Sequence, residues 1–461
     1  MDHERLTRVG HFFLAGDNAT NDRHGVLVAI LGPDESGKLP TPERIAALLA
    51  SRLHLVPRRF RRVLLPAPFS IAAPLLVDDL EGGLPRLQVL GPEGMGRDAF
   101  RRALMGFACH PVDFRRPLWE IALAPRLEDG TAALVVKLHH AIVEGEGAGA
   151  ILAALFFARA PSEAIGEPTP WTPAPPPGIG RQLRLAALDQ ARRLADTAAR
   201  TARVGWAWRQ PKAQWRKLMK MRLAYRTQLN RRRPESMFSR PVGSAFDHQV
   251  AVGDSRTVLD ICERCGDAAS FDDVVLAAIA GGLRRWLAAI GEPLSEIVIQ
   301  LAISVGSRGL GPSRDFTDMP SLMVVELPID EPDPANRLRR VCATTTQRRP
   351  QLRALQTIQA PLAHLPMPLY RRTAGWLCEQ GFDFHIASLR GPPVQPYVLA
   401  NPVELAYIMA PVRGRYPLRM TVLSFGGKLT ISFGCDPDII REPEMLARAI
   451  EAALDELSHA V

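Results

Sequence analysis

The sequence predicts an α/β protein made of two halves that a long, basic helical connector joins. Strand-like apolar runs alternate with amphipathic helical segments before residue 160, and the same alternation returns after residue 242. A proline-rich stretch and then an arginine-rich helical stretch separate the two regions. A chain of 461 residues is also longer than one ordinary hydrophobic core supports. The expected organisation is therefore 1–160, a connector at 161–241, and 242–461.

The first half is expected to contain three strands and two helices. The predicted strands are Gly25–Leu31, Trp119–Leu123 and Thr131–Leu138, and the helices begin at Thr41 and span Ala148–Ala160. Thr41 is a cap residue with a proline directly after it, and this order favours a helix start. Asp129-Gly130 predicts a hairpin turn between the last two strands.

The connector and the second half follow from the same patterns. Pro161–Gly180 is rich in proline and is expected to be stiff and exposed. Arg181–Arg233 is predicted to be helical and basic, because only Asp189 and Asp196 oppose its arginines and lysines. In the second half we expect helices at Thr257–Gly266, Phe271–Ile290 and Glu442–Leu457, strands at Ile297–Val305 and Leu322–Leu327, and a hairpin of Leu418–Phe425 and Lys428–Phe433 turning on Gly426-Gly427.

The charge balance restricts the partners of the chain. Lysine and arginine (57) outnumber aspartate and glutamate (48), which gives a formal net charge of +9. A basic surface suits nucleic acid, an anionic membrane or a phosphate-bearing substrate. No nucleic-acid-binding motif accompanies the charge, so nucleic acid is not the expected partner. No secretory signal or membrane-spanning stretch is visible, which favours the cytoplasm, with peripheral contact to the membrane.

The six cysteines do not predict a metal site. Cys262 and Cys265 form a Cys-x-x-Cys, but no second cysteine pair or histidine pair stands nearby at the spacing of a zinc site. Both cysteines also fall in a predicted helix. Structural thiols are therefore the favoured interpretation, ahead of metal binding or redox chemistry.

The segment from His139 to Gly145 is the main candidate for chemistry. It follows a predicted strand, and loops after strands are where rigid folds present reactive groups. An imidazole is the natural general base near neutral pH, and the Glu144 carboxylate stands close enough in sequence to support it. Neighbouring histidines on a strand point to opposite sides, so one of the two faces a given pocket. Two other interpretations stay open, a chance pair among the eleven histidines and a zinc site without a visible third ligand.

Further motifs surround this segment over most of the chain. In order they are His110–Glu120 with its Pro-Leu-Trp-Glu, His139–Gly145, Ser270–Leu276 with Gly281–Leu287, Ile303–Arg308, Ala387–Pro392 and Thr421–Gly427. Together these blocks resemble the bacterial wax ester synthase/acyl-CoA:diacylglycerol acyltransferase family. That family is one of the His-His-x-x-x-Asp-Gly acyltransferases, a group that also includes chloramphenicol acetyltransferase and nonribosomal peptide condensation domains.

The resemblance implies both a fold and a reaction. The fold would be two chloramphenicol-acetyltransferase-like α/β domains, pseudo-symmetric, with an active-site tunnel between them. The reaction would move a fatty acyl group from acyl-CoA to diacylglycerol, giving triacylglycerol, or to a long-chain alcohol, giving a wax ester. His140 would be the general base that deprotonates the alcohol. Acyl-CoA is then a co-substrate, and neither a cofactor nor a metal is expected.

The resemblance also implies supporting roles in the histidine loop. His139 is expected to pack behind its neighbour and to support the loop. Glu144 stands where the family has aspartate, followed by the motif glycine, Gly145. Arg308 is the preferred ion-pair partner of Glu144, since a buried lone carboxylate is costly.

Three candidates come from the second half of the chain. Ser388 stands where the family usually has asparagine, and it is either a hydrogen-bond donor to the tetrahedral oxyanion or an ordinary loop serine. Asp272 stands where the family has asparagine, and Asp273 follows it at the start of a predicted helix. The helix dipole alone favours acidic residues at that position.

Two rival functions remain beside the acyl-CoA-dependent enzyme. One is a condensation-type acyltransferase that takes its acyl group from a carrier-protein thioester, although no carrier domain lies on this chain. The other is a catalytically weakened relative that binds lipid. The connector residues 181–233 are either a solvated linker or an interfacial anchor on an anionic membrane or lipid body, and the anchor is favoured. Acceptor identity, acyl chain length and oligomeric state do not follow from the sequence.

Overall fold

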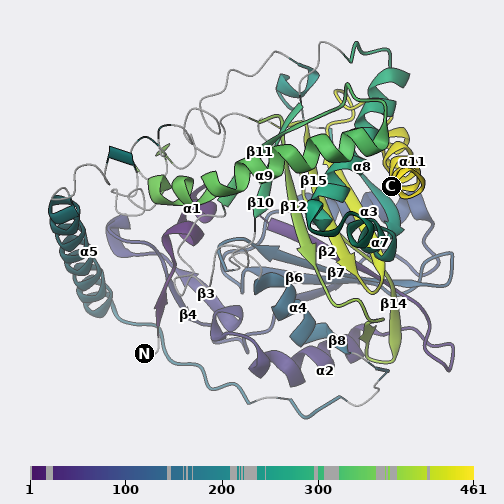
Figure 1. The fold of residues 1–461 in the computed structure, drawn as a ribbon. Helices are drawn as coiled ribbons and strands as arrows, with labels where there is room; N and C mark the ends of the chain where they lie inside the picture. Colours follow the sequence, from purple (N-terminus) through teal and green to yellow (C-terminus); the bar gives the residue numbers. More distant parts are fainter. Residues whose placement is uncertain are drawn as a thin grey trace.

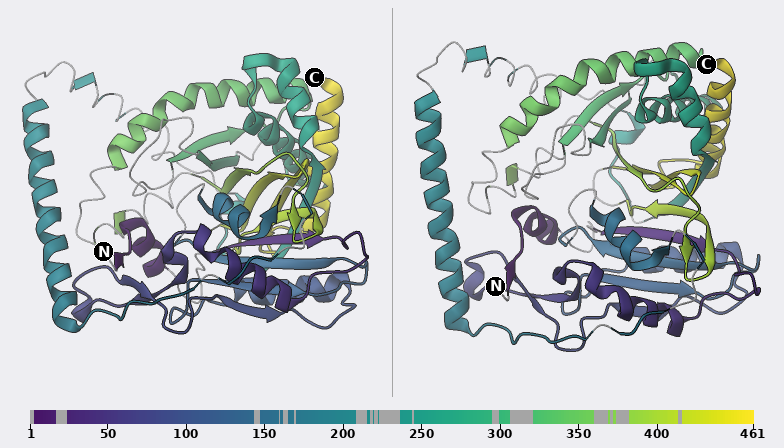
Figure 2. Two further views of the ribbon diagram at one scale, coloured as in Figure 1. Left: turned by 90° about the horizontal axis from the view of Figure 1, so that it is seen from below. Right: turned by 60° about the horizontal axis from the view of Figure 1, so that its bottom comes forward.

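The protein is described by a computed structural model that contains two large β-sheets with helices packed against them (Figure 1). The described residues are 3–16, 24–142, 147–158, 160–161, 165–168, 170–207, 215–216, 219, 222, 236–243, 245–294, 299–305, 321–359, 369, 372–373, 382–412 and 416–461. Within them the mixed α/β class expected from the sequence is confirmed. In Figure 2 the first half of the chain lies below and the second half above.

The first large sheet has seven strands in the order β5-β6-β7-β2-β14-β13-β8. Their bounds are β2 (His24–Leu31), β5 (Arg86–Val89), β6 (Trp119–Ala124), β7 (Ala132–His139), β8 (Phe157–Ala158), β13 (Tyr397–Val398) and β14 (Asn401–Met409). The predicted hairpin is confirmed as the antiparallel pair β6 and β7. Its turn contains Gly130 with a positive φ of 83°, a backbone conformation that glycine adopts without strain.

The second large sheet has six strands in the order β11-β10-β12-β15-β16-β9. Their bounds are β9 (Asp247–Asp254), β10 (Ile299–Val305), β11 (Ser321–Leu327), β12 (Phe384–Arg390), β15 (Leu418–Phe425) and β16 (Lys428–Cys435). β15 and β16 pair antiparallel, as predicted, around Gly426 and Gly427. Both turn glycines have positive φ, which is the geometry of a tight hairpin turn.

Helices cover both sheets, and a small third sheet completes the first half. The helices are α1 (Arg8–Gly16), α2 (Pro42–Arg52), α3 (Arg97–Cys109), α4 (Gly147–Phe156), α5 (Ile179–Ala207), α7 (Ser255–Cys265), α8 (Phe271–Ala289), α9 (Pro334–Gln359) and α11 (Pro443–Ala460). The short 3-10 helices are η1 (Leu53–Leu55), η2 (Arg58–Arg61), η3 (Pro68–Ser70), η5 (Met237–Ser239) and η6 (Gly266–Ala268). The small sheet has the order β1 (Glu4–Arg5), β4 (Leu75–Asp78) and β3 (Arg62–Leu65).

Most helix predictions are confirmed, and one needs a correction. Thr41 caps α2 by accepting a hydrogen bond from the Arg44 amide. The helix expected over Ala148–Ala160 ends at Phe156, and the next residues form β8. The reason lies far away in sequence, because Phe157 pairs with Val398 at the edge of the seven-stranded sheet. A sequence pattern alone does not show such a long-range strand pairing.

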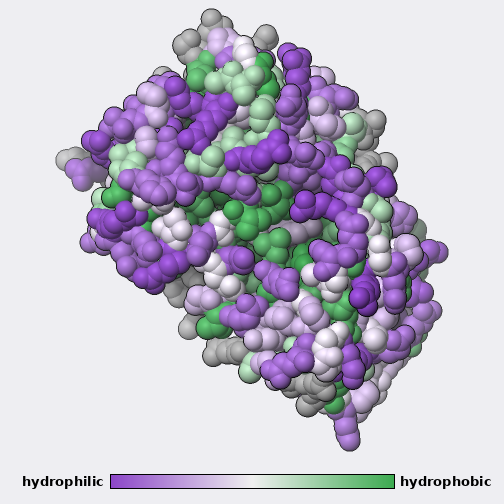
Figure 3. Space-filling view, turned by 90° about the vertical axis from the view of Figure 1, so that its right-hand side faces the viewer, coloured by the Kyte–Doolittle hydropathy of each residue, from purple (hydrophilic) through white to green (hydrophobic). Residues whose placement is uncertain are grey.

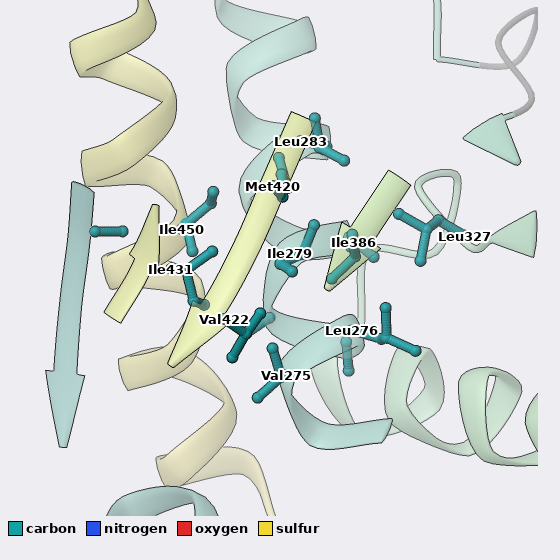
Figure 4. Close-up of a cluster of buried hydrophobic side chains, with 14 of the residues drawn as sticks. Val275, Leu276, Ile279, Leu283, Leu327, Ile386, Met420, Val422, Ile431 and Ile450 are labelled. Carbon is teal, nitrogen blue, oxygen red and sulfur yellow. The ribbon is translucent and has the colours of Figure 1, made fainter. Parts of the chain in front are cut away.

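The hydrophobic core of the second half surrounds α8, which is buried nearly all round (Figure 4). Val275, Ile279 and Leu283 of α8 lie behind β12 and β15, near Ile386, Met420 and Val422, in one apolar cluster that also contains Ile450 of α11 (Figure 4). Gly282 allows α11 to approach closely. A Cβ at position 282 would lie 2.7 Å from the Ile450 Cα atom, so a larger residue would push the helices apart.

The two sheets are joined by more than the connector. β14 comes from the second half of the sequence, yet it pairs antiparallel with β2 in the sheet of the first half. On its other side, Thr430 of β16 donates a hydrogen bond to the Ala406 carbonyl of β14 at 2.9 Å, and Thr421 and Ser432 donate to the Ile408 carbonyl. The boundaries 1–160, 161–241 and 242–461 stay a prediction, but β14 ties the two sheets together.

The proline-rich segment is docked on the first half, although the sequence favoured an exposed connector. Trp171 is half-buried, its indole N–H donates to the Asp79 carbonyl at 2.8 Å, and the Arg61 guanidinium lies 3.9 Å from the ring centroid. The Ala174 amide donates to the Asp78 carboxylate at 3.0 Å. A charged and aromatic surface on the first half therefore holds this segment, and a proline count cannot reveal that surface.

The acid sensitivity of this attachment is a testable prediction. Burial raises the pKa of Asp78, but hydrogen bonds from Arg58, Ala174 and Arg62 outweigh it, and the pKa falls from 3.8 to about 2. The carboxylate therefore stabilises the fold above about pH 4, and this contribution, about 2 kcal/mol, is lost as the pH falls toward 2. Asp78→Asn should lower the urea midpoint at pH 6 and flatten its dependence on pH between 5 and 3, by intrinsic fluorescence. The exposed Asp267→Asn is the control, and equal slopes in both variants would contradict this account.

Candidate active site

His139 and His140 lie where β7 ends, at the edge of a strand whose residues are all buried. His139 is fully buried, and its backbone amide donates to the Leu118 carbonyl at 3.0 Å. Its ring Nδ1 accepts a hydrogen bond from the Ala141 amide at 3.0 Å, which turns the chain back on itself directly after the strand. This environment suits a residue that supports the loop, the role that the sequence analysis expects for His139, and that role stays a prediction.

His140 is half-buried and lies between two elements of the first half. Its ring centroid is 5.2 Å from that of Phe13 on α1. On the other side it approaches the start of β2, where a Cβ at Gly25 would lie 3.9 Å from the His140 Cε1 atom. An imidazole with partial access, flanked by an aromatic ring and a glycine, suits proton transfer to a substrate that reaches it from the open side.

Helix α1 is pressed onto the histidine loop. The backbone of Gly10 lies so close that a Cβ there would be 2.6 Å from the Ala141 carbonyl oxygen, a distance that no side chain tolerates. The Gly10 amide donates to the Thr7 hydroxyl at 3.0 Å at the start of this helix. Helix α1, which carries the apolar residues Phe12, Phe13 and Leu14, therefore packs beside the histidine loop.

A buried ion pair between β6 and β7 supports the strand that leads into the histidine loop. Lys137 is fully shielded from solvent, and its Nζ atom lies 2.7 Å from Oε2 of Glu120, its register partner on β6. Nζ also donates to the carbonyls of Phe107 and His110, at 3.1 and 2.9 Å, at the end of α3. All three ammonium protons are thus bonded, which is what makes a buried lysine tolerable.

The same strand end is tied to α3 a second time. His24 is the register partner of His139 on β2, and its Nε2 atom bonds the Ala108 carbonyl. Together with Lys137, it satisfies carbonyls at the C-terminus of α3 that lack partners within the helix. The position of His140 is consequently set by a strand that α3 holds in register.

Ser388 and Asp272 form a second group of predicted residues, at the N-terminus of α8. The Ser388 hydroxyl on β12 donates to the Asp272 carboxylate at 2.8 Å. The Arg390 guanidinium lies 3.5 Å from the other carboxylate oxygen and 4.4 Å from the Phe271 ring centroid. The structure therefore brings Asp272 and Ser388 into direct contact, on the second sheet, whereas His139 and His140 end a strand of the first sheet.

Asp273 belongs to the fold of α8 rather than to an open site. It is buried and forms a capping box with Ser270, whose amide donates to the Asp273 carboxylate at 2.9 Å. Thr345 of α9 donates to its other oxygen at 2.7 Å. A capping box of this kind stabilises the start of a helix. This geometry therefore favours the interpretation that Asp273 is an acidic residue stabilising the N-terminus of α8.

Three predicted site residues lie outside the described residues: Glu144, Gly145 and Arg308. The expected ion pair of Glu144 and Arg308 therefore stays a prediction. The sequence analysis did not assign Lys137 or Phe13 to the site. A signal for Lys137 was present, since one lysine and one glutamate interrupt two neighbouring apolar strands at Lys137 and Glu120. Phe13 had no comparable signal.

Five of the six cysteines lie within the described residues, and none of these five forms a disulfide. Cys109, Cys262, Cys265, Cys342 and Cys435 are free thiols. Burial, and then the charge of Asp273, raises the pKa of Cys342 to about 12, and burial also raises the pKa of Cys262. Neither is a thiolate at neutral pH. No group of three or more histidine, cysteine or acidic residues in the described ranges is arranged to hold a metal ion.

Comparison with known protein families defines the class of this protein as an acyltransferase. Residues 6–252 match the wax ester synthase/diacylglycerol acyltransferase catalytic domain, and residues 319–458 match the C-terminal domain of that family. The chain therefore belongs to the wax ester synthase/diacylglycerol acyltransferase family, as the sequence motifs had indicated. It is an acyl-CoA-dependent O-acyltransferase of that type.

Individual relatives agree with this assignment. The Mycobacterium tuberculosis protein tgs1, named a probable diacylglycerol O-acyltransferase, is 25% identical over 496 residues, covering 99% of this chain and 96% of tgs1. A second protein of that species, whose name also describes it as a diacylglycerol O-acyltransferase, is 28% identical over 341 residues. The match covers 72% of this chain and 70% of that protein.

Solved structures show the same fold. The wax ester synthase/diacylglycerol acyltransferase from Marinobacter aquaeolei VT8 superimposes with a TM-score of 0.63 at 19% identity and covers 98% of both chains. The first condensation domain of the calcium-dependent antibiotic synthetase gives a TM-score of 0.56 at 16% identity, covering 99% of this chain and 95% of that one. The resemblance to condensation domains is thus confirmed at the level of the fold.

Proposed function

We propose that His140 is the general base of the transfer reaction. Its imidazole takes the proton from the acceptor hydroxyl as the oxygen attacks the thioester carbonyl of acyl-CoA. The tetrahedral intermediate collapses with cleavage of the carbon–sulfur bond, the imidazolium proton passes to the leaving thiolate, and the products are an ester and free CoA. The observation that carries this proposal is the position of His140, partly accessible at the end of a buried, doubly anchored strand.

The proposed acceptors are diacylglycerol, giving triacylglycerol, and long-chain alcohols, giving wax esters. Apolar residues of α1 border the imidazole, with the Phe13 ring beside that of His140. An acceptor with a hydrocarbon tail would bury that tail against such residues, whereas a small polar alcohol would gain little. We further propose that two pseudo-symmetric, chloramphenicol-acetyltransferase-like domains enclose a tunnel in which both substrates meet.

The oxyanion role proposed for Ser388 requires a change of partner. Its hydroxyl donates to Asp272 at 2.8 Å, so the proton is already engaged. To stabilise an oxyanion, the hydroxyl would have to turn away from Asp272 when substrate binds. Arg390 would then remain as the cation beside the carboxylate.

Glu144 provides a prediction for the loop. We propose that its carboxylate pairs with Arg308 and holds the loop that follows His140. Glu144→Gln should lower kcat about ten-fold, because a small displacement of a catalytic group is costly, whereas Glu144→Asp should keep or raise activity. Steady-state kinetics with a fixed acyl-CoA and alcohol would measure both. If Glu144→Gln leaves both the rate and the thermal unfolding unchanged, the ion pair does not exist.

Purified protein offers the direct test of the function. It should release free CoA from a long-chain acyl-CoA only when an alcohol is present, with one ester formed for each thiol released. Thiol titration and thin-layer chromatography over a panel of diacylglycerol, hexadecanol and short alcohols would measure this. Thiol release that does not depend on acceptor would indicate hydrolysis and would contradict the proposal.

The carrier-protein alternative can be separated in the same assay. The likeness to condensation domains motivates it, because those proteins share the fold. Comparison of one acyl group presented on CoA and on a phosphopantetheinylated carrier protein would decide between the donors. Higher kcat/KM with the carrier would favour that alternative. Binding of acyl-CoA without transfer to any acceptor would favour the catalytically weakened, lipid-binding relative.

Residues 181–233 are proposed to make peripheral contact with an anionic membrane or lipid body. Of this stretch the structure describes α5 as far as Ala207, together with a few residues beyond it. No helix in the described ranges is long and apolar enough to cross a bilayer. Arginines and exposed leucines on α5 support a contact at the surface of a bilayer.

A further inference from the structure

We propose that the η3 turn and the outward face of α5 form a single docking surface for an anionic bilayer, with Phe69 as the residue that inserts. We name this the η3–α5 surface and define it by Phe69 and Ile71 with Leu183, Leu188 and Leu194. It deepens the proposed membrane contact, which rested on the connector alone, and it adds a turn more than one hundred residues earlier in the chain.

Phe69 is displayed to solvent in an unusual conformation. Its side chain is 86% exposed, and its backbone has a positive φ of 55°, which a bulky residue rarely adopts. Ile71, two residues later, is also exposed. A strained backbone that presents a large apolar side chain to water gives nothing to the folded core, and such strain is typical of functional positions.

The outward face of α5 carries exposed leucines and alanines among its arginines. Gln182, Ala186 and Asp189 lie on the less exposed side, at the spacing of one helix face. On the other side Leu183, Leu188 and Leu194 are exposed, and Leu194 is exposed by 72%. Ala187 and Ala191 are exposed between them, together with Arg184 and Arg192. A helix that turns leucines away from its own protein needs another partner for them.

Contacts between the two elements make this one surface. The Gln190 side chain of α5 donates to the Ile71 carbonyl at 3.4 Å. Arg5 of β1 binds Asp189 of α5 and donates to the Ala73 carbonyl, so it bridges the helix to the chain that follows η3. In both views of Figure 2, α5 runs along one edge of the molecule, with its outer side open.

Charge identifies an anionic bilayer as the occupant. Arg181, Arg184 and Arg192 are exposed on the same helix, and its one described acidic side chain, Asp189, is engaged by Arg5. Mixed leucine and arginine on one helix suits the boundary between lipid headgroups and acyl chains. A second copy of the chain would instead bring two rows of arginines together, which repel each other.

The η3–α5 surface also connects to the histidine loop. Arg5 stands three residues before α1, and α1 carries Phe13 beside His140. A bilayer held against α5 would therefore lie next to the segment that leads into α1. Lipid acceptors could then pass from the bilayer toward His140 along this helix, without crossing water.

Vesicle binding tests this proposal with a matched pair of variants. Full-length Phe69→Asp should bind vesicles of about three parts phosphatidylcholine to one part phosphatidylglycerol about ten-fold more weakly than wild type. Leu259→Asp on α7, the same kind of change at an exposed apolar residue outside the η3–α5 surface, should bind as wild type. Phe69→Trp gives a direct signal, since its fluorescence should shift to the blue on vesicles and not on phosphatidylcholine alone. Unchanged binding of Phe69→Asp, or wild-type binding that ignores lipid charge, would overturn the proposal.

Two further measurements keep this inference separate from the proposed reaction. With a short, water-soluble alcohol, Phe69→Asp should transfer acyl groups at the wild-type rate, because only the approach to lipid is lost. Vesicle binding without acyl transfer would contradict the proposed reaction but would still support the proposed docking surface. Sedimentation of wild type as a dimer without lipid, and of Phe69→Asp as a monomer, would assign the surface to a second copy and overturn the bilayer.

Discussion

Replacing His140 by alanine is expected to lower kcat for acyl transfer by about 10²- to 10⁴-fold while the fold stays intact, which is the usual contribution of a general base. The side chain is half-buried and follows a strand whose own residues hold the sheet, so its removal leaves the core unchanged. The KM for acyl-CoA should change little, because the imidazole acts on the acceptor hydroxyl. Circular dichroism and the urea midpoint would verify that the variant is folded.

His459→Ala is the matched control for this experiment. His459 is exposed near the end of α11, and its ring hydrogen-bonds the Ser458 hydroxyl and the Asp455 carbonyl of the same helix. Its removal should leave kcat unchanged. Equal rates for wild type and His140→Ala, with both proteins folded, would exclude His140 as the base. A ten-fold loss in both histidine variants would point to general damage instead.

Lys137→Met is expected to destabilise the protein by about 3 to 5 kcal/mol, since it leaves the Glu120 carboxylate buried without its cation. Both partners are shielded from solvent, and Nζ also binds the carbonyls at the end of α3. Removal of the ammonium group therefore leaves three acceptors without their donor. The urea unfolding midpoint at neutral pH would measure the loss.

The double variant Lys137→Met with Glu120→Leu separates the charge from the packing. Two apolar side chains of similar volume should recover most of the lost free energy of unfolding, because neither buries a charge. The exposed pair Arg256 and Asp260 on α7 is a control, and Arg256→Met should cost about 0.5 kcal/mol or less. If Lys137→Met were as harmless as that exposed variant, the ion pair would not stabilise the strand.

Short-range features of the fold could be predicted from the sequence. The Thr41 cap, the hairpin on Gly426-Gly427 and the apolar run of α8 each depend on residues close together in the chain, and each is confirmed. The class of enzyme also followed, because several motif blocks occur in the right order, and the family match confirms it.

Long-range features could not be predicted in the same way. β8 forms because Phe157 pairs with Val398 of β13. Trp171 packs on the first half because the Arg61 guanidinium lies over its ring. Both partners are distant in sequence, so no local pattern indicates them. The same holds for the site, where the contact of Ser388 with Asp272 joins residues 116 positions apart. Loop position could be predicted, but side-chain partners depend on tertiary packing.

Apolar residues, drawn in green, gather across the middle of the face shown in Figure 3. β14 pairs with β2 and accepts hydrogen bonds from hydroxyls of β15 and β16, so it links the two sheets. Synthesis from the ribosome proceeds from the N-terminus, so β2 emerges long before residues 401–409 exist. Until then one edge of β2 is an open template for wrong pairing. Expression of residues 1–160 alone should therefore give aggregates, because β2 then lacks its partner β14.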